Sequence, residues 1–159
     1  MTIRNNSEYV ISSKPFQRPS LQATMGSPYY FVIIGSKDNP VYEADLAPTS
    51  RPSSAADGIK FIIHSALDIV EEIQWNTNAT YLKVVDKFNE FLISAFVSAG
   101  NTKFMLLHDT KSEDSIKNFF QDVHELYLKV LMNPFYEFNQ PITNSYFDGK
   151  VRLIAKRFL

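Results

Sequence analysis

The hydrophobic pattern changes its period along the chain, and this change constrains the fold more than any other feature. Short apolar runs rich in β-branched and aromatic residues come first, a helical stripe follows, further short runs come next, and two helical stripes end the chain. Strands bury every second side chain, whereas helices bury every third or fourth, so each change of period marks a new element. The predicted order is β-β-α-β-β-β-α-α, which is typical of an α+β protein with one five-stranded antiparallel sheet.

Five short runs predict the strands. They are Tyr29–Ile34, Val41–Leu46, Tyr81–Val85, Phe91–Val97 and Phe104–Leu107. Turn residues between the first two runs predict a hairpin with one strand buried on both faces and one strand at the edge of the sheet. The last three runs predict a meander, with a polar break over residues 86–90 and a turn at Gly100-Asn101.

Three stripes at helical spacing predict the helices. The first is expected to run from near Gly58 to near Trp75, after an exposed Pro/Ser-rich loop over residues 47–57. The second begins at a capping box over Thr110–Glu113 and ends at Asn133-Pro134, because proline cannot continue the helical hydrogen bonds. The third carries the stripe Phe147, Val151, Ile154 and Phe158.

The domain organisation follows from length and composition. The 159 residues, of which 45% are hydrophobic, suffice for one domain, which we place at residues 27–159. Residues 1–26 are polar and contain two prolines, so they are expected to form a flexible tail. The chain has no cysteine and no apolar run of the roughly 20 residues that a membrane span needs, so we expect a cytoplasmic protein.

Charge and glycine usage exclude several functions. The chain has 16 basic and 17 acidic side chains, and this balance gives no general attraction for nucleic acid, so no nucleic-acid partner is expected. The five glycines are dispersed and form neither a phosphate-binding loop nor a dinucleotide motif. We therefore predict no cofactor, and the absence of cysteine excludes thiolate metal sites.

Three histidines are the only candidates for imidazole bases: His64, His108 and His124. His108-Asp109 closes a strand, but strand neighbours point to opposite faces, so we interpret the pair as a polar strand end that caps the next helix. His64 and Asp68 share one helical face, yet two residues make no metal site, and a surface pair or partner contact is the simpler interpretation. We expect no catalytic residues and no metal site.

Two surface features could serve a partner. Four cations lie within the last ten residues (Lys150, Arg152, Lys156 and Arg157), and at about 1 kcal/mol each they could support a weak phospholipid contact. The alternative is a solvated helix face. Three aromatics lie in the loop Asn133–Phe138, where some of them could be exposed and available to a partner.

Several strings of the sequence resemble the sedlin family, the subunit-two family of the transport protein particle (TRAPP) complexes. The likeness runs in order from about residue 28 to 158. The strings are Tyr30–Gly35, Asp38–Glu43, Ser65–Asp68, Trp75, Tyr81–Lys83, Val85–Glu90, Ser94–Val97, Leu107–Asp109, Glu113-Asp114, Ile116–Phe120 and Met132–Glu137. The polar tail, the Pro/Ser-rich loop and Gly149 depart from the family pattern.

The resemblance implies a longin-like or profilin-like fold, with the first helix on one face of the sheet and the last two on the other. It implies a non-enzymatic adaptor subunit of TRAPP, a tethering and Rab-exchange complex in endoplasmic-reticulum-to-Golgi transport. Expected partners are other small TRAPP subunits, with a Rab-type GTPase and endoplasmic-reticulum or Golgi membranes contacted through the complex. The resemblance places Asp68 on the exposed side of the first helix where neighbouring subunits dock, and its face also carries His64, Glu71 and Glu72. It also implies structural roles for Ser94, Phe104 and Val151.

Two other hypotheses compete with this one. The chain could be a different longin-type trafficking adaptor or a SNARE-regulating module, in which case the fold would be the same and the partners different. An enzymatic hypothesis would depend on His108 and Asp109.

Overall fold

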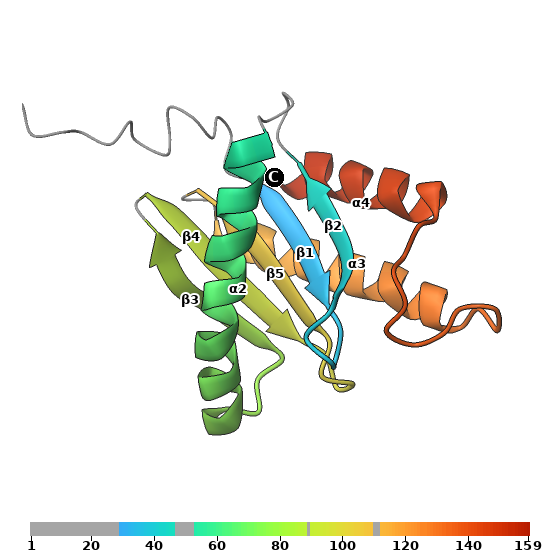
Figure 1. Cartoon of the computed structure of the whole chain (residues 1–159), viewed down its shortest axis with the longest axis horizontal. Helices are drawn as coiled ribbons and strands as arrows, with labels where there is room; N and C mark the ends of the chain where they lie inside the picture. The colour runs from blue at the N-terminus through green and yellow to red at the C-terminus, as the bar shows by residue number, and fades with distance from the viewer. Residues whose placement is uncertain (1–28, 47–52, 89, 110–111) are drawn as a thin grey trace, which may run out of the picture.

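The computed structural model describes residues 29–46, 53–88, 90–109 and 112–159, which form a five-stranded antiparallel sheet with helices on both faces (Figure 1). The strands are β1 (Tyr30–Ile34), β2 (Pro40–Asp45), β3 (Tyr81–Phe88), β4 (Phe91–Val97) and β5 (Lys103–His108). The helices are α2 (Ser53–Asn76), α3 (Glu113–Leu131) and α4 (Ser145–Phe158). The predicted α+β class and element order are confirmed, while the predicted tail over residues 1–26 lies outside the described residues.

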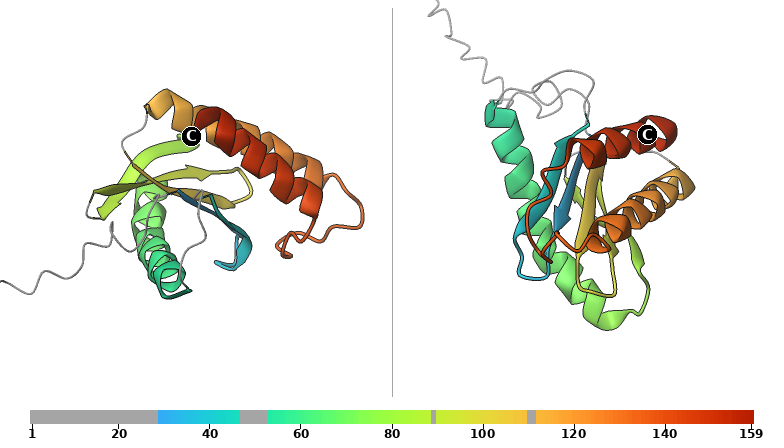
Figure 2. Two further views of the ribbon diagram at one scale, coloured as in Figure 1. Left: turned by 90° about the horizontal axis from the view of Figure 1, so that it is seen from above. Right: turned by 90° about the vertical axis from the view of Figure 1, so that its right-hand side faces the viewer.

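The strand order β2-β1-β5-β4-β3 joins the hairpin to the meander through β1 and β5. Figure 2 shows α2 on one face of the sheet and α3 and α4 on the other. Side chains of β1 alternate between these faces: Val32 packs in the core beneath α2, whereas Phe31 and Ile33 pack in the core beneath α3 and α4. All five β1 side chains are buried, as predicted for a strand covered on both faces.

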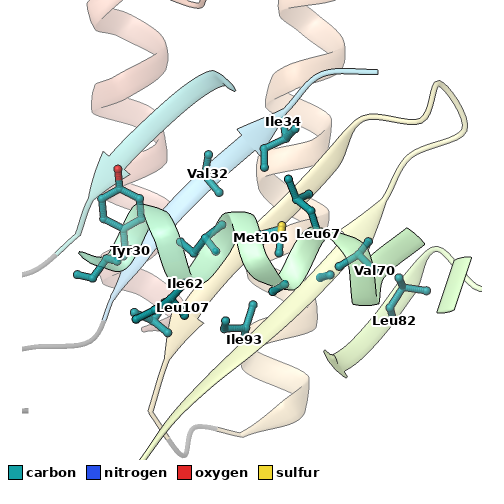
Figure 3. Close-up of a cluster of buried hydrophobic side chains, with 14 of the residues drawn as sticks. Tyr30, Val32, Ile34, Ile62, Leu67, Val70, Leu82, Ile93, Met105 and Leu107 are labelled. Atoms are coloured by element: carbon teal, nitrogen blue, oxygen red, sulfur yellow. The ribbon is translucent and has the colours of Figure 1, made fainter. Parts of the chain in front are cut away.

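The core beneath α2 is mainly aliphatic, with Tyr30 and Phe91 as its buried aromatic residues (Figure 3). Helix α2 contributes Ile59, Ile62, Ile63, Ala66, Leu67 and Val70. The helix begins at Ser53, five residues before the predicted start near Gly58. The composition of residues 47–57 suggested a loop, but Ala55 and Ala56 are strong helix formers and can extend a helix beyond its apolar stripe.

The core beneath α3 and α4 is rich in aromatic rings. Phe119 and Phe120 of α3 and Phe147 of α4 are fully buried, and the Phe119 ring meets the Phe31 ring edge-on at a centroid distance of 5.2 Å. The predicted capping box was wrong: the N-cap residue of α3 is Ser112, and its side chain makes no cap hydrogen bond. Thr110 lies outside the described residues, and Glu113 forms an ion pair with Lys83 of β3 at 3.5 Å.

Both edges of the sheet deviate from a regular ladder. At the β2 edge, the carbonyl oxygen of Val41 accepts a hydrogen bond from the Ile142 amide at 2.8 Å, and that of Asp45 accepts one from the Arg152 guanidinium at 3.0 Å. At the other edge, β3 has two register shifts, and Lys83 adopts a left-handed φ of 64°. Such bulges interrupt the row of groups that another strand could pair with.

Within the described segments, no helix combines the length and apolarity that crossing a bilayer would require.

Candidate functional site

The outer face of α2 carries a stripe of five exposed side chains, which we call the α2 stripe: Phe61, His64, Asp68, Glu72 and Trp75. Their spacing of three or four residues places them on one side of the helix, opposite the isoleucines that pack on the sheet. Phe61 is 73% exposed and Trp75 is 89% exposed, so an aromatic ring stands at each end. From Phe61 to Trp75 the stripe extends roughly 21 Å at 1.5 Å per residue.

This arrangement fits a protein-binding surface. Aromatic residues are enriched at protein interfaces because they supply large, rigid contact areas. Asp68 and Glu72 lie between the two rings and give the stripe a negative charge, so a complementary surface would offer apolar pockets and basic side chains. The interaction we considered between His64 and Asp68 is not formed, because no hydrogen bond or ion pair joins these two described residues.

The sequence reasoning identified the charged residues of the α2 stripe but missed its two aromatic residues. Trp75 marked the end of the helix and formed part of the family resemblance, but it was given no role in binding, and Phe61 was given no role at all. Both lie on the same helical face as Asp68 and outside the isoleucine stripe, and that was the signal that could have identified them.

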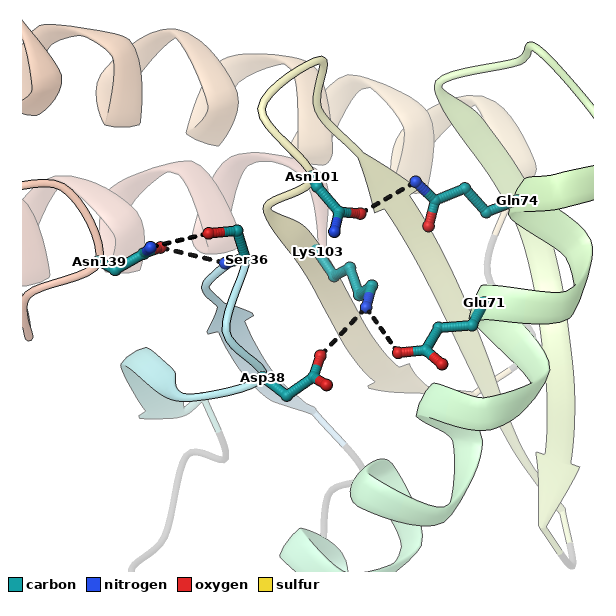
Figure 4. A network of polar contacts seen from close by, with 7 residues as sticks. All are labelled: Ser36, Asp38, Glu71, Gln74, Asn101, Lys103 and Asn139. Carbon is teal, nitrogen blue, oxygen red and sulfur yellow. Dashed lines mark hydrogen bonds and ion pairs between the residues drawn. The ribbon is translucent and has the colours of Figure 1, made fainter.

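Glu71 differs from the other predicted interface residues because it forms an intramolecular ion pair (Figure 4). Its carboxylate lies 3.2 Å from the ammonium of Lys103, which is also 3.2 Å from the carboxylate of Asp38. The Lys103 side chain is only 2% exposed, and a buried ammonium needs nearby opposite charge to be tolerated. Glu71 therefore connects α2 to β5 and to the β1–β2 loop.

A second polar contact lies beside this ion pair. The side-chain amide of Gln74 donates a hydrogen bond to the side-chain oxygen of Asn101 at 2.9 Å, which connects α2 to the turn between β4 and β5 (Figure 4). Together the two contacts hold the C-terminal half of α2 on the sheet. The α2 stripe is thereby presented on a helix with a defined orientation.

The three residues with predicted structural roles are fully buried. Ser94 lies on β4, Phe104 on β5 and Val151 on α4, and none of them has solvent exposure. Phe104 and Val151 belong to the aromatic core beneath α3 and α4. Their structural role stays a prediction.

Ser94 and His108 form a pair that resembles a nucleophile and its base. The Ser94 hydroxyl lies 2.7 Å from Nε2 of His108, whose Nδ1 lies 2.6 Å from the backbone carbonyl oxygen of Asp109. Desolvation lowers the pKa of His108 below 6.5, so the imidazole is neutral at physiological pH. Because Ser94 is 0% and His108 is 2% exposed, a substrate has no access to the pair. The pair joins β4 to β5 instead.

The prediction that His108 and Asp109 cap the next helix was wrong, because Ser112 occupies the N-cap of α3. The Asp109 carboxylate accepts a hydrogen bond from the Tyr29 hydroxyl at 2.9 Å. Burial and this carboxylate raise the pKa of Tyr29. Among the described residues, no three histidine or acidic side chains gather in a way that could hold a metal ion.

The predicted basic group at the end of the chain is smaller than the sequence suggested. Arg152 donates to the Asp148 carboxylate at 3.0 Å in addition to its bond with the Asp45 carbonyl oxygen. Asp148 also accepts a hydrogen bond from the Tyr42 hydroxyl at 2.6 Å, and this bond is the main reason that the pKa of Asp148 is lowered. Arg152 thus stabilises the β2 edge, and the other three cations of α4 make no ion pair within the described residues.

The fold defines a class: a small α+β module of the longin-like type. Comparison with known proteins adds the family. The family model for sedlin matches residues 33–157, and the chain belongs to the sedlin family.

Three relatives illustrate this membership. The chain is 53% identical to the transport protein particle 20 kDa subunit of Schizosaccharomyces pombe over 82% of this chain and 98% of the relative. It is 39% identical to the probable trafficking protein particle complex subunit 2 of Drosophila melanogaster, over 84% of this chain and 98% of the relative. It is 36% identical to the trafficking protein particle complex subunit 20 of Saccharomyces cerevisiae, over 83% of this chain and 98% of the relative. The family is one of non-catalytic subunits, so membership favours the adaptor hypothesis over the enzyme and the other longin-type modules.

Proposed function

We propose that this chain is a non-catalytic adaptor subunit of a TRAPP trafficking complex. The 53% identity with the fission yeast subunit, which extends over nearly the whole of that relative, carries this conclusion. The buried Ser94–His108 pair is consistent with it, because this pair resembles a reactive centre but is closed to solvent.

The α2 stripe is the surface through which we propose that the chain binds sister subunits. It combines two exposed aromatic rings with two carboxylates on a helix that is held by the Lys103 ion pair. In this arrangement Phe61 and Trp75 fill pockets on the partner, while Asp68 and Glu72 select a basic surface. Glu71 acts indirectly, through its contact with Lys103.

Affinity purification of the tagged full-length chain tests this proposal. The wild-type protein should recover other small TRAPP subunits, identified by mass spectrometry. Trp75→Ala and Asp68→Lys should each reduce that recovery about tenfold or more, since aromatic and charged anchors of an interface are typically worth at least about 1.4 kcal/mol. Glu90→Lys provides a matched charge reversal at an exposed position outside the stripe and should leave recovery unchanged.

Two results would count against the proposal. A wild-type chain that behaves as a monodisperse monomer and recovers no TRAPP subunit would contradict its adaptor function. Normal recovery with Trp75→Ala and Asp68→Lys would retain the adaptor function but remove the α2 stripe as the docking surface.

The more detailed parts of the proposal concern location and partners. Relatives are named as subunits of transport or trafficking particles, and we propose that this chain acts at endoplasmic-reticulum and Golgi membranes as part of such a particle. Contact with a Rab-type GTPase and with the membrane would then be made through the complex. Imaging of the tagged chain with Golgi markers checks the location, and nucleotide-exchange assays with and without the subunit check its contribution.

A further inference from the structure

A groove between α3 and α4 opens on the side of the molecule opposite α2. The two helices lie side by side and run in opposite directions on their face of the sheet (Figure 2). The groove has a volume of about 730 Å³, and its lining includes Val130 of α3 together with Phe147 and Ile154 of α4. Its volume is in the range of sites that hold small ligands or several side chains of a peptide.

One end of the groove is aromatic. Phe135 and Tyr136 come from the loop after α3, and Tyr146 comes from the first turn of α4. Phe135 is 93% exposed and Tyr146 is 65% exposed, although both line the groove. A phenylalanine ring so fully exposed at the rim of a groove is typical of a site that a partner covers.

Charges are distributed unequally along the groove. Because α3 and α4 are antiparallel, Lys129 of α3 and Lys150 of α4 both lie toward the aromatic end. Lys150 stands over the Tyr146 ring at 5.3 Å, a contact that orients the ammonium but leaves its charge uncompensated. Asp122 and Glu125 line the groove roughly one to two turns further from this end on α3, and Arg157 lines it near the C-terminal end of α4. The aromatic end is therefore cationic.

We propose that this groove binds an acidic, amphipathic helical segment of a partner protein. Apolar side chains spaced three or four residues apart fill the groove between α3 and α4, and carboxylates at one end of the segment pair with Lys129 and Lys150. This surface lies across the sheet from the α2 stripe, so the chain can hold two partners at the same time. The inference does not depend on which complex the chain joins.

Charge and shape favour this occupant over two others. The first 28 residues of this chain carry three basic residues and one acidic residue, so they are not an acidic segment. An anionic membrane would present negative charge along the whole groove and would be repelled by Asp122 and Glu125, whereas the proposed segment carries its carboxylates only at the end near Lys129 and Lys150. A concave surface also suits a protruding helix better than a flat bilayer.

Selection from a peptide library tests the proposal with the full-length chain. The library holds amphipathic helices of about 15 residues with fixed leucines at helical spacing and with Asp, Glu, Lys or Arg at every solvent-facing position. We expect the chain to enrich acidic peptides. Enrichment of basic or neutral peptides, or no enrichment, would overturn the proposal.

Variants locate the binding. Phe135→Ala should weaken the selected peptides at least tenfold, and Lys150→Glu should weaken them several-fold and reduce the salt dependence of binding. Repeating the selection on the double variant Lys129→Glu/Lys150→Glu should reverse the preference toward basic peptides. Phe61→Ala and Lys117→Glu are the matched controls, with an exposed aromatic on α2 and an exposed cation of α3 outside the groove, and both should bind normally.

Three outcomes would assign the surface differently. Equal weakening by Phe61→Ala would place the peptide on the α2 stripe. Binding to phosphatidylcholine vesicles with about 30% phosphatidylserine, lost in Phe135→Ala, would make it a membrane surface. Self-association in analytical ultracentrifugation that Phe135→Ala removes would place a second copy of the chain in the groove. Each of these results would overturn the proposal.

Discussion

Replacing Phe104 by alanine should remove a large part of the stability of this domain. Phe104 is fully buried on the central strand β5, and four rings surround it at centroid distances of 5.5 to 6.3 Å: Phe31, Phe96, His124 and Tyr127. Phe→Ala in a core costs about 3 to 5 kcal/mol, and the surrounding ring contacts place Phe104 in the upper part of this range. β5 pairs with β1 on one side and β4 on the other, so the backbone cannot move into the cavity. We therefore expect a loss of about 4 to 5 kcal/mol.

Urea unfolding followed by circular dichroism measures this loss. A single domain is stabilised by only about 5 to 15 kcal/mol, so the unfolding midpoint should fall by about 2 M at a typical slope. Phe135→Ala is the matched control because its ring is 93% exposed, and it should change stability by less than about 0.5 kcal/mol. A loss below about 1 kcal/mol for Phe104→Ala, or an equal loss in both variants, would refute the assignment of Phe104 as a core residue.

Three further perturbations test other features. Gly35→Ala should destabilise the domain by about 1 to 3 kcal/mol, because the added Cβ would lie 2.5 Å from Oδ1 of Asn139. Gly149→Ala has open space around the added Cβ and should stabilise α4 by about 0.5 to 1 kcal/mol. Thermal melts that show the opposite order would contradict both expectations. Glu71→Gln or Asp38→Asn alone should lower the free energy of unfolding by about 1 kcal/mol or less, because each carboxylate is about half exposed. The double variant leaves the buried Lys103 ammonium without a counter-charge and should cost several kcal/mol. Additive losses in a double-mutant cycle would argue against the shared ion pair. Desolvation lowers the pKa of His108 below 6.5, so the unfolded chain takes up a proton first and stability falls as the pH decreases below 6.5. The urea midpoints at about pH 7.5 and about pH 5.5 should therefore differ less in His108→Gln than in the wild type. An unchanged difference would show that His108 is not the source of the pH dependence.

The sequence predicted well those elements whose buried residues follow a local period. The isoleucine stripe of α2 and the alternation along β1 each reflect one element against one face of the sheet, so the residues themselves carry the signal. Boundaries were less reliable. The polar break was expected from residue 86, but β3 continues to Phe88, because a bulged edge strand with one exposed face tolerates Asp86 and Lys87.

Contacts between distant residues could not be predicted in the same way. Lys103 opens an apolar strand, and its partners Glu71 and Asp38 are 32 and 65 residues away, so no local pattern identifies it as a buried cation. The bond of Arg152 to the Asp45 carbonyl oxygen spans 107 residues and has no local signal, whereas its ion pair with Asp148, four residues away, could have been predicted from helical spacing.

The two candidate surfaces differ in the same respect: one lies on a single helix, and the other is formed by distant elements. The charges of the α2 stripe lie on one helix, so their common face follows from spacing alone. The groove requires the relative position of α3, α4 and the loop between them, and the sequence indicated only that the aromatics of this loop could be exposed.

The obstruction of both sheet edges has a consequence for assembly. A strand from another protein can add to a sheet only where consecutive backbone amides and carbonyls are free, and here Ile142 and Arg152 occupy two β2 carbonyls while bulges distort β3. Backbone pairing is tolerant of sequence, since every strand offers the same groups. A subunit whose sheet edges are obstructed must be recognised through its side chains, so the identity of its neighbours depends on a small number of individual residues and can change by point substitution without any change in the fold.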